Sequence, residues 1–421
     1  MRPVWFFAFS ALLFAQSQAP VKPKDVREIA KQGASAIPQL TQFLSNPDRD
    51  VRIEAVKQII EIGPPRSIDP LIQATHDNDP EVQIRATDGL VNFYLPGYVK
   101  SGLSGSLHKV GTGIKGHFTD TNDQVIQPYI TVRSDVIAAL GRLVRGGASV
   151  DARANAARAV GILRGKDAMP DLLDATHSKV TPIIYESLVA LEKIRDESAG
   201  PKIEFLIHDF NSKVQATAIE AVGLLRDKAA LPALTQVLNE SRDPKVRHSA
   251  LEAIAMLPDP SSRPLYALYL QDKDDKLRAA AAEGFARLRD KSDLPLLQKA
   301  WDAEAKPEPR LSIAFAEVMD GKTELSEFSP LQFLINNLNS SAYNGEALPF
   351  LVELAREPAV RALLYQPMAN GDKAEKIGLA QVLGRSGDKE SLPALQKLTN
   401  DPDPDVAQAA LNAVRNLQSR L

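Results

Sequence analysis

The chain lacks cysteine and is poor in aromatic residues. Among its 421 residues there is no Cys, and Phe, Trp and Tyr together make up 6%. The absence of Cys excludes disulfide bonds, thiolate-ligated zinc or iron–sulfur sites, a Cys nucleophile and a lipid anchor on Cys. A surplus of positive charge is also lacking, since 50 Lys and Arg stand against 53 Asp and Glu. The resulting net charge of −3 argues against a nucleic-acid-binding protein, which normally carries a basic surplus on its binding face.

Long apolar runs are absent apart from one short run near the N-terminus. Residues 4–15 follow Arg2 and are apolar except for Ser10. Such a run is too short to span a bilayer, which needs roughly 20 residues, but it is typical of the core of a secretory signal peptide. Small residues at Ala15 and Ser17 offer cleavage points. We therefore expect residues 1–19 to be a signal peptide and the protein to be exported, either to the periplasm or outside the cell. A buried N-terminal helix and an uncleaved membrane anchor are the alternatives.

The body of the chain repeats with a nearly constant period. Prolines recur at intervals that are equal to within one position, at Pro170, Pro201, Pro232, Pro264 and Pro295. Around one of them, Leu231, Leu234 and Leu238 lie on one face of a predicted first helix, with the proline in its first turn, where a missing N–H costs little. The predicted second helix has an apolar face of its own, made of Val246, Ala250, Ala253, Ile254 and Leu257. One such hairpin cannot bury both faces alone, so stacking on its neighbours must complete the core.

These residues resemble the HEAT repeat, and specifically the short bacterial form called the PBS-lyase HEAT-like repeat. The units share an opening of an apolar residue, Pro, any residue and Leu, and a turn of Asp, Pro, any residue and Val, as at 79–82 and 243–246. They close on a small residue, an apolar residue and Gly, as at 139–141, 159–161 and 221–223. The resemblance extends over nearly all of residues 24–421, in about ten repeats. It implies an all-α, right-handed α-solenoid of HEAT-like helical hairpins with one Gly-rich insertion, similar to armadillo-like helical proteins.

Two regions interrupt the period. Residues 96–128 separate the second repeat from the next predicted helix, near 131–145, and residues 321–390 are only loosely repeat-like, with two degenerate hairpins predicted over 329–355 and 358–384. We therefore predict HEAT-like repeats over 24–95 and 129–320, an insertion over 96–128, and degenerate and C-terminal capping repeats over 321–421.

The insertion is the first candidate binding site. Residues 89–119 contain no Asp or Glu, and apolar residues within this stretch follow a helical spacing. A free helix here would be destabilised by on the order of 4–5 kcal/mol relative to Ala by five glycines, so it would form only when packed against something. These are Gly102, Gly105, Gly111, Gly113 and Gly116. The insertion could fold back on the solenoid, bind a partner protein with its apolar stripe, or contact an anionic membrane or polyanion with its lysines. The candidate partner-binding residues are Lys100, Leu107, Lys109, Ile114, Lys115 and Phe118.

No motif for covalent catalysis or for a cofactor is present. His76 and His177 end predicted first helices, and His208 follows His177 by one period of the repeat. Ligand nitrogens must lie about 2.1 Å from zinc, whereas packed helices lie about 8–10 Å apart, so we interpret these residues as favoured by the helix dipole. The HEAT-like deoxyhypusine hydroxylases hold di-iron with His-Glu pairs, and this chain has no His-Glu dipeptide. Nothing marks a bilin site of the kind that bilin lyases need. We predict no catalytic, cofactor or metal residues.

These observations predict an exported bacterial scaffold rather than an enzyme. We expect it to bind a partner protein through its concave surface, lined by the second helices, and through the insertion. The main alternative is a peripheral envelope protein that docks on an anionic membrane through the basic amphipathic segment 99–118. An enzyme with an unrecognised site is a third hypothesis. No nucleic acid partner is expected, and the oligomeric state stays open.

Overall fold

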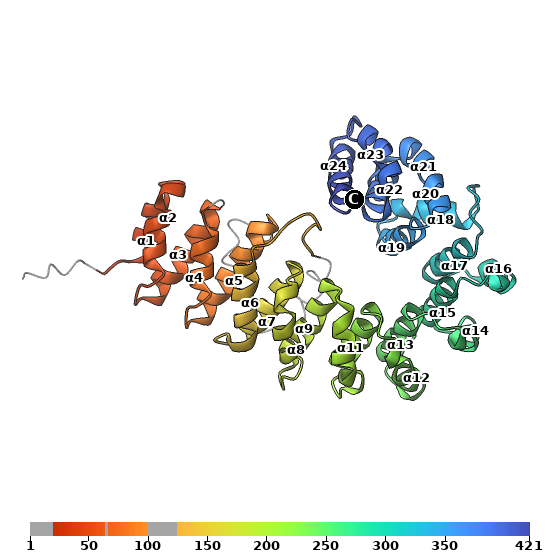
Figure 1. Ribbon diagram of the computed structural model, residues 1–421, viewed down its shortest axis with the longest axis horizontal. Coiled ribbons are helices and arrows are strands. Elements are labelled where there is room, and N and C mark those ends of the chain that lie inside the picture. Colours follow the sequence, from red (N-terminus) through yellow and green to blue (C-terminus); the bar gives the residue numbers. More distant parts are fainter. Residues whose placement is uncertain (1–19, 64–65, 100–123) are drawn as a thin grey trace, which may run out of the picture.

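The protein is an α-solenoid of antiparallel helix pairs that stack side by side (Figure 1). The computed structural model describes residues 20–63, 66–99 and 124–421. Over these ranges the chain forms helices and connecting segments, with no strand. The all-α solenoid predicted from the repeat pattern is therefore confirmed.

Each pair consists of a first helix, which is shorter than the second except in the equally long α6 and α7, and a second helix that packs against the next pair. The first helices are α2 (Ile37–Phe43), α4 (Ile68–Ala74), α6 (Ser134–Gly146), α8 (Met169–Ala175), α10 (Gly200–Ile203), α12 (Leu231–Glu240), α14 (Arg263–Tyr269), α16 (Leu294–Ala303), α18 (Pro330–Asn336), α20 (Pro358–Leu363) with α21 (Tyr365–Asn370), and α23 (Leu392–Leu398). The second helices are α3 (Arg49–Ile62), α5 (Pro80–Tyr94), α7 (Val150–Ile162), α9 (Thr181–Ile194), α11 (Ser212–Leu224), α13 (Pro244–Met256), α15 (Asp275–Leu288), α17 (Pro307–Met319), α19 (Asn344–Leu354), α22 (Lys373–Ser386) and α24 (Pro404–Gln418). Helix α1 (Pro23–Ala30) precedes the first pair.

Short 3₁₀ helices flank many of the first helices. They are η1 (Gly33–Ala36), η3 (Lys166–Ala168), η4 (Glu197–Ala199), η5 (Glu204–His208), η6 (Lys228–Ala230), η7 (Pro260–Ser262), η8 (Lys291–Asp293), η9 (Asn337–Asn339) and η10 (Lys389–Ser391). The helix expected near 131–145 is α6, and the segment 329–355 contains α18 and α19. In the segment 358–384, the first helix is divided into α20 and α21.

The Pro and Asp residues of the repeat determine where the helices begin. Pro170 and Pro232 occupy the first turns of α8 and α12, where their missing N–H groups would have no helical partner in any case. Asp243 caps α13, because its side chain accepts the backbone N–H of Lys245 at 2.9 Å. Asp48 caps α3, which begins at Arg49, and its side chain accepts the backbone N–H of Asp50 at 2.9 Å.

The core lies between the helix pairs, and small residues bring the second helices close together. Leu234 of α12 and Val246 of α13 are 0% exposed, as the apolar spacing predicts. A Cβ added at Gly223 of α11 would lie only 2.8 Å from the Cα of Ala253 on α13. The glycine at the close of the repeat is therefore needed for the close approach of neighbouring second helices.

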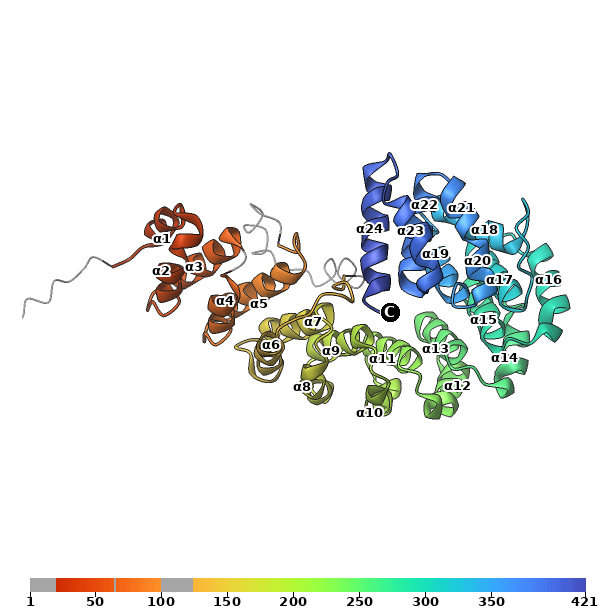
Figure 2. The same ribbon diagram turned by 45° about the horizontal axis from the view of Figure 1, so that its top comes forward.

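The solenoid curves until its C-terminal repeats return to the middle of the chain (Figures 1 and 2). The side-chain amide of Asn416, in α24, donates to Oε1 of Gln127 at 3.0 Å. Gln127 belongs to the segment that leads into α6, and this segment is held to the second-helix layer by the backbone N–H of Ile126, which donates to the carbonyl of Ile162 at 3.0 Å. The second helices thus form the inner wall of a nearly closed curve.

Candidate functional site: an arginine-lined hollow

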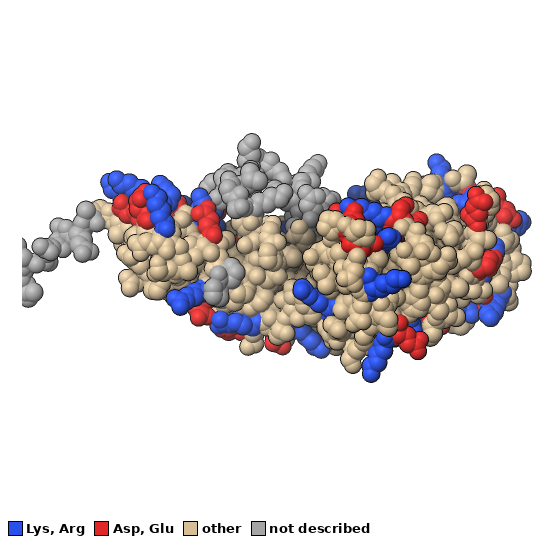
Figure 3. Space-filling view, turned by 90° about the horizontal axis from the view of Figure 1, so that it is seen from above, with Lys and Arg blue, Asp and Glu red and all other residues tan. Residues whose placement is uncertain are grey.

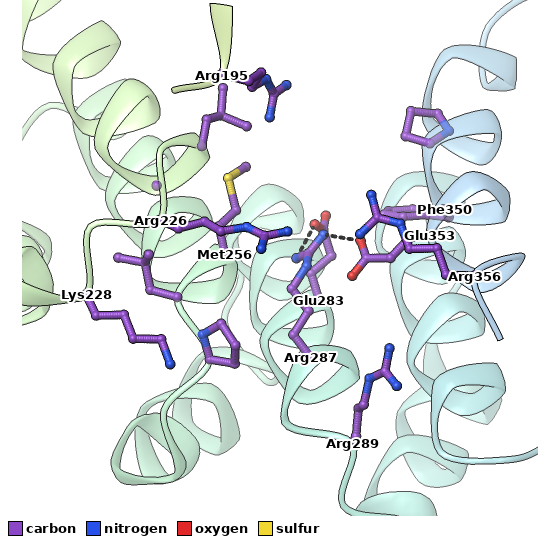
Figure 4. A pocket seen from close by; sticks show the side chains of 15 residues that line it. Arg195, Arg226, Lys228, Met256, Glu283, Arg287, Arg289, Phe350, Glu353 and Arg356 are labelled. Atoms are coloured by element: carbon purple, nitrogen blue, oxygen red, sulfur yellow. Dashed lines mark hydrogen bonds and ion pairs between the residues drawn. The ribbon is translucent and has the colours of Figure 1, made fainter. Parts of the chain in front are cut away.

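The inner wall contains a hollow of about 650 Å³ between the stretch α9 to α15 and helix α19 (Figure 4). We call this hollow the arginine pocket. Its charged lining residues are the cations Arg195, Arg226, Lys228, Arg287, Arg289 and Arg356 and the carboxylates Glu283 and Glu353. Six cations therefore face two carboxylates in a chain whose net charge is −3. By contrast, basic and acidic residues lie side by side on the face seen in Figure 3.

Four arginines occupy the same place at the end of a second helix, just after its last turn. Arg164, Arg195, Arg226 and Arg289 have φ values of 49°, 60°, 57° and 56°, which is the left-handed region. Glycine normally ends a helix in this conformation because it has no Cβ to clash. A residue with a side chain there costs on the order of 1 kcal/mol. Four repeats thus carry an arginine where glycine would be less strained.

The cations of the pocket differ in how they are paired. Arg287 lies between two carboxylates, with Nη1 at 3.0 Å from Glu283 and Nη2 at 3.2 Å from Glu353 (Figure 4). Within the described part of the chain, no carboxylate lies within 4 Å of Arg195 or Arg356. Both can therefore meet a ligand anion without first breaking an ion pair.

The arginines along the inner wall lie near one another. Burial lowers the pKa of Arg164, and Arg195 and Arg385 lower it further. Burial also lowers the pKa of Arg195, which Glu192 partly offsets and Arg226 lowers again. Arg385 comes from α22, so the curvature of the solenoid brings it near a residue that lies several repeats earlier in the chain. The cations repel one another, and an anion placed among them would relieve this repulsion.

A row of carboxylates runs beside the arginines. Glu220, Glu252 and Glu283 occupy the same position on α11, α13 and α15. Burial raises the pKa of each, and the pKa of Glu252 reaches about 7 because Glu283 and Glu220 also repel its charge. Burial raises the pKa of Glu192, on α9, to about 8. The Ser249 hydroxyl donates to Glu220 at 2.8 Å. Part of this carboxylate row is therefore protonated near neutral pH.

We expect Glu252→Gln to flatten the pH dependence of stability. The pKa of Glu252 is raised from 4.5 to about 7 by burial and by Glu283, Glu220 and Glu308, with Lys276 partly offsetting them. The folded state therefore holds a proton that the unfolded state has already released. The stabilisation that Glu252 contributes through this proton is complete below about pH 4.5 and is lost as the pH rises through about 7.

The measurement is the urea midpoint of unfolding at about pH 5 and about pH 8, followed by circular dichroism. The wild type should lose more stability between these two values than Glu252→Gln does. Glu240→Gln, at an exposed position of α12, is the matched control and should follow the wild type. Equal pH slopes for the wild type and Glu252→Gln would contradict the assignment.

The candidate residues of the insertion lie outside the described residues. They are Lys100, Leu107, Lys109, Ile114, Lys115 and Phe118. The structure describes the two ends of the insertion, 96–99 and 124–128, where the backbone N–H groups of Gly97 and Val99 donate to Oδ1 of Asn92 at 3.1 and 3.0 Å. The binding role of the insertion therefore stays a prediction. Sequence reasoning passed over the inner-wall arginines, although Arg164, Arg195 and Arg226 follow one another at the period of the repeat.

Two of the three histidines singled out in the sequence contact another side chain. The ring of His177 stacks on Phe205 with centroids 4.6 Å apart, and Nε2 of His76 lies 2.9 Å from Nη2 of Arg142. Among the described residues, no three His, Asp or Glu side chains are placed to share a metal ion. Over the same ranges, no helix combines the length and the apolar character that crossing a membrane requires.

Comparison with protein families agrees with the repeat geometry. A family model described as HEAT repeats matches residues 19–100, 201–265, 234–317 and 360–420, which is more than half of the chain. The chain belongs to the HEAT-repeat family. The resemblance inferred from the Pro, Asp-Pro and Gly positions is thereby confirmed. Among curated protein sequences, none matches this HEAT-repeat protein.

Solved structures similar to this HEAT-repeat protein share low sequence identity with it. The complex of CpcE and CpcF of phycocyanin lyase from Nostoc sp. PCC7120 is 17% identical over 63% of this chain and 91% of that chain, with a TM-score of 0.38. YibA of Escherichia coli is 15% identical over 72% of this chain and 99% of its own, with a TM-score of 0.41. An engineered protein is 17% identical over 91% of this chain and 98% of its own, with a TM-score of 0.36.

Proposed function

We propose that this HEAT-repeat protein is a non-catalytic scaffold that binds a segment of a partner protein along its inner wall. The observation that carries this proposal is the arginine pocket, a hollow to which α15, α19 and the ends of α9 and α11 all contribute. Solenoids use such extended concave surfaces for binding, because each repeat adds a small part of the contact area. HEAT-repeat proteins as a family bind protein partners, which supports the same proposal.

The chemistry of the pocket favours binding over catalysis. Five of its six cations are arginines, which stay protonated in proteins and therefore do not serve as general acids or bases. Its two carboxylates, Glu283 and Glu353, are both engaged by Arg287. This arrangement can attract and orient an anionic group, and no reacting group is needed for that.

Photo-crosslinking from the inner wall tests the scaffold proposal. A photoreactive amino acid at Met256, which lines the pocket, should crosslink the full chain to a partner protein in its native host. The matched control is the same amino acid at Leu268, a 68% exposed residue of α14 on the outer side of the curve. A product specific to Met256 supports the proposal. Identical products at both positions, or none at Met256, would overturn it.

Export forms the second part of the proposal. The apolar run 4–15 behind Arg2 and the small residues that follow it support a signal peptide within residues 1–19. The protein recovered from the periplasm or the medium of its host should begin after Ala15 or Ser17 when its N-terminus is sequenced. A cytoplasmic protein that retains the whole segment 1–19 would contradict export.

The insertion 96–128 supports a second contact, either with a partner protein or with an anionic membrane. The stretch 89–119 contains lysines and no acidic residue, which favours contact with anions. Liposome flotation of the full chain, with a version lacking 98–127 as control, separates the two. Flotation that salt and the deletion both abolish supports membrane docking through 99–118, and no flotation at any salt concentration removes it.

A further inference from the structure

We propose that the arginine pocket and the arginines beside it bind an acidic polypeptide segment, extended as a polyproline II helix with a carboxylate at about every third residue. This inference rests on the proposed scaffold function and names the chemistry of the partner segment. It follows from three properties of the inner wall: the sign of its charge, the spacing of its arginines, and the apolar side chains between them.

The charge of the pocket favours an anionic ligand, because its lining holds six cations and two carboxylates. Both carboxylates are engaged by Arg287 in the centre of the hollow. Two of the surrounding arginines form exposed ion pairs, Arg226 with Glu197 at 3.6 Å and Arg289 with Glu357 at 2.5 Å, which a ligand carboxylate must displace. Arg195 and Arg356 lie on opposite sides of the hollow in Figure 4, and within the described residues neither has a carboxylate within 4 Å. Guanidinium groups match the planar geometry of carboxylates with two parallel hydrogen bonds.

The spacing of the arginines selects the conformation of the ligand. Helices α7, α9 and α11 pack directly on one another, and packed helices lie about 8–10 Å apart. Arg164, Arg195 and Arg226 end these helices in the same backbone conformation, so their side chains start from points separated by about that distance. A polyproline II chain returns to the same face every three residues, which is about 9 Å at 3.1 Å per residue. A β-strand returns to the same face after about 7 Å and an α-helix after about 5–6 Å.

Apolar side chains distinguish a polypeptide from a simple polyanion. The partly exposed Met256 and the exposed Pro258 and Pro349 line the pocket beside its cations, above the buried Leu257 and Phe350. A peptide offers apolar atoms between its carboxylates and can use these contacts, whereas phosphate or a sulfated glycan offers mainly charge. The cations also surround the hollow and do not converge on one point, which suits several separate carboxylates better than one phosphate.

A pair of synthetic peptides tests the spacing directly. The probe is four repeats of Glu-Pro-Pro with a fluorophore, bound to the full chain and followed by fluorescence anisotropy. The matched peptide has the same composition with its four glutamates contiguous, and a third peptide carries Gln in place of Glu. We expect the periodic peptide to bind on the order of tenfold tighter than the contiguous one, and the Gln peptide to show no binding. Equal affinity for the periodic and contiguous peptides would overturn the spacing argument.

Variants of the protein locate the binding site. Arg195→Gln with Arg226→Gln should weaken the periodic peptide on the order of tenfold or more. Arg242→Gln with Lys245→Gln removes two exposed cations, one in the turn between α12 and α13 and one in the first turn of α13, and should leave the affinity unchanged. Arg195→Gly removes the same side chain while easing its left-handed backbone, so it should weaken binding without lowering the melting temperature. Unchanged affinity in all the inner-wall variants would overturn the inference.

The remaining outcomes identify a different ligand or a different partner segment. Pyrophosphate or heparin that binds at the same arginines while the peptide does not would replace the peptide by a phosphate or glycan ligand, and the inference would fail. Crosslinking from Met256 separates this failure from failure of the scaffold proposal. A partner that crosslinks there, and that the periodic peptide does not displace, overturns the acidic segment and leaves the scaffold in place.

Discussion

Replacing Glu186 with Ala is expected to lower the free energy of unfolding by about 3 kcal/mol or more. Glu186 of α9 is 3% exposed and accepts two hydrogen bonds from Arg158 of α7, at 2.7 Å from Nη2 and 3.2 Å from Nε. Removing the Glu186 carboxylate leaves the largely buried guanidinium of Arg158 without this partner. The neighbouring carboxylate, Asp88, does not replace it, because Asp88 accepts a hydrogen bond from Asn155. The loss should exceed that of an exposed ion pair because the guanidinium cannot regain its water shell.

The matched control is Glu28→Ala at the N-terminal end of the solenoid. Glu28 and Lys31 also form an ion pair at 2.7 Å, but their side chains are 68% and 70% exposed. The expected loss there is below about 0.5 kcal/mol, because water replaces the partner. Urea unfolding followed by circular dichroism at 222 nm gives both values. Similar losses for the two variants would show that burial does not decide the strength of the pair between α7 and α9.

Replacing Gly284 with Val is expected to cost about 3 kcal/mol. Gly284 lies in α15 against the ring of Tyr266, and a Cβ at this position would stand 2.6 Å from Cδ1 of that ring. The ring has little freedom to move away, since it is 0% exposed, its hydroxyl donates to the carbonyl of Ile254 at 3.0 Å, and Phe285 packs edge-on against it. The variant must therefore displace either the ring or the helix that carries Glu283 and Arg287.

A second glycine and a double variant separate this clash from the general cost of Val in a helix. A Cβ at Gly146, at the end of α6, would meet nothing within 4 Å, so Gly146→Val should change stability by less than about 1 kcal/mol. Combining Gly284→Val with Tyr266→Ala should cost less than the sum of the single changes, because the smaller side chain opens the space. Strict additivity would show that Tyr266 is not the obstacle.

Much of the local structure could be predicted from the repeat pattern. Pro232 and Asp243 stand where the sequence places the starts of two helices, and Leu234, Val246 and Ile254 are buried as their spacing requires. These features depend on neighbours a few residues away, so the local sequence is enough to predict them.

The candidate site was far less predictable. The insertion is a candidate on composition alone, because residues 89–119 contain no Asp or Glu. In the sequence, Arg195, Arg226 and Arg289 resemble ordinary solvent-exposed residues. Their common left-handed conformation and their position on the inner wall become visible only in the structure. Arg356, from a different pair at α19, is part of the same pocket without any sequence signal that links it to Arg195.

The repeat, the starts of its helices, its buried faces and the family follow from the amino-acid sequence, because these depend on short-range spacing and on residues with strong backbone preferences. Which side chains share a surface depends instead on how the helix pairs pack along the whole solenoid. Small rotations between successive pairs, set by contacts such as Gly223 against Ala253, accumulate along the solenoid. Their sum brings Arg385 near Arg164 and Asn416 within 3.0 Å of Gln127. The sequence of a single repeat does not show this accumulated rotation, and the packing of all the repeats together creates the arginine pocket.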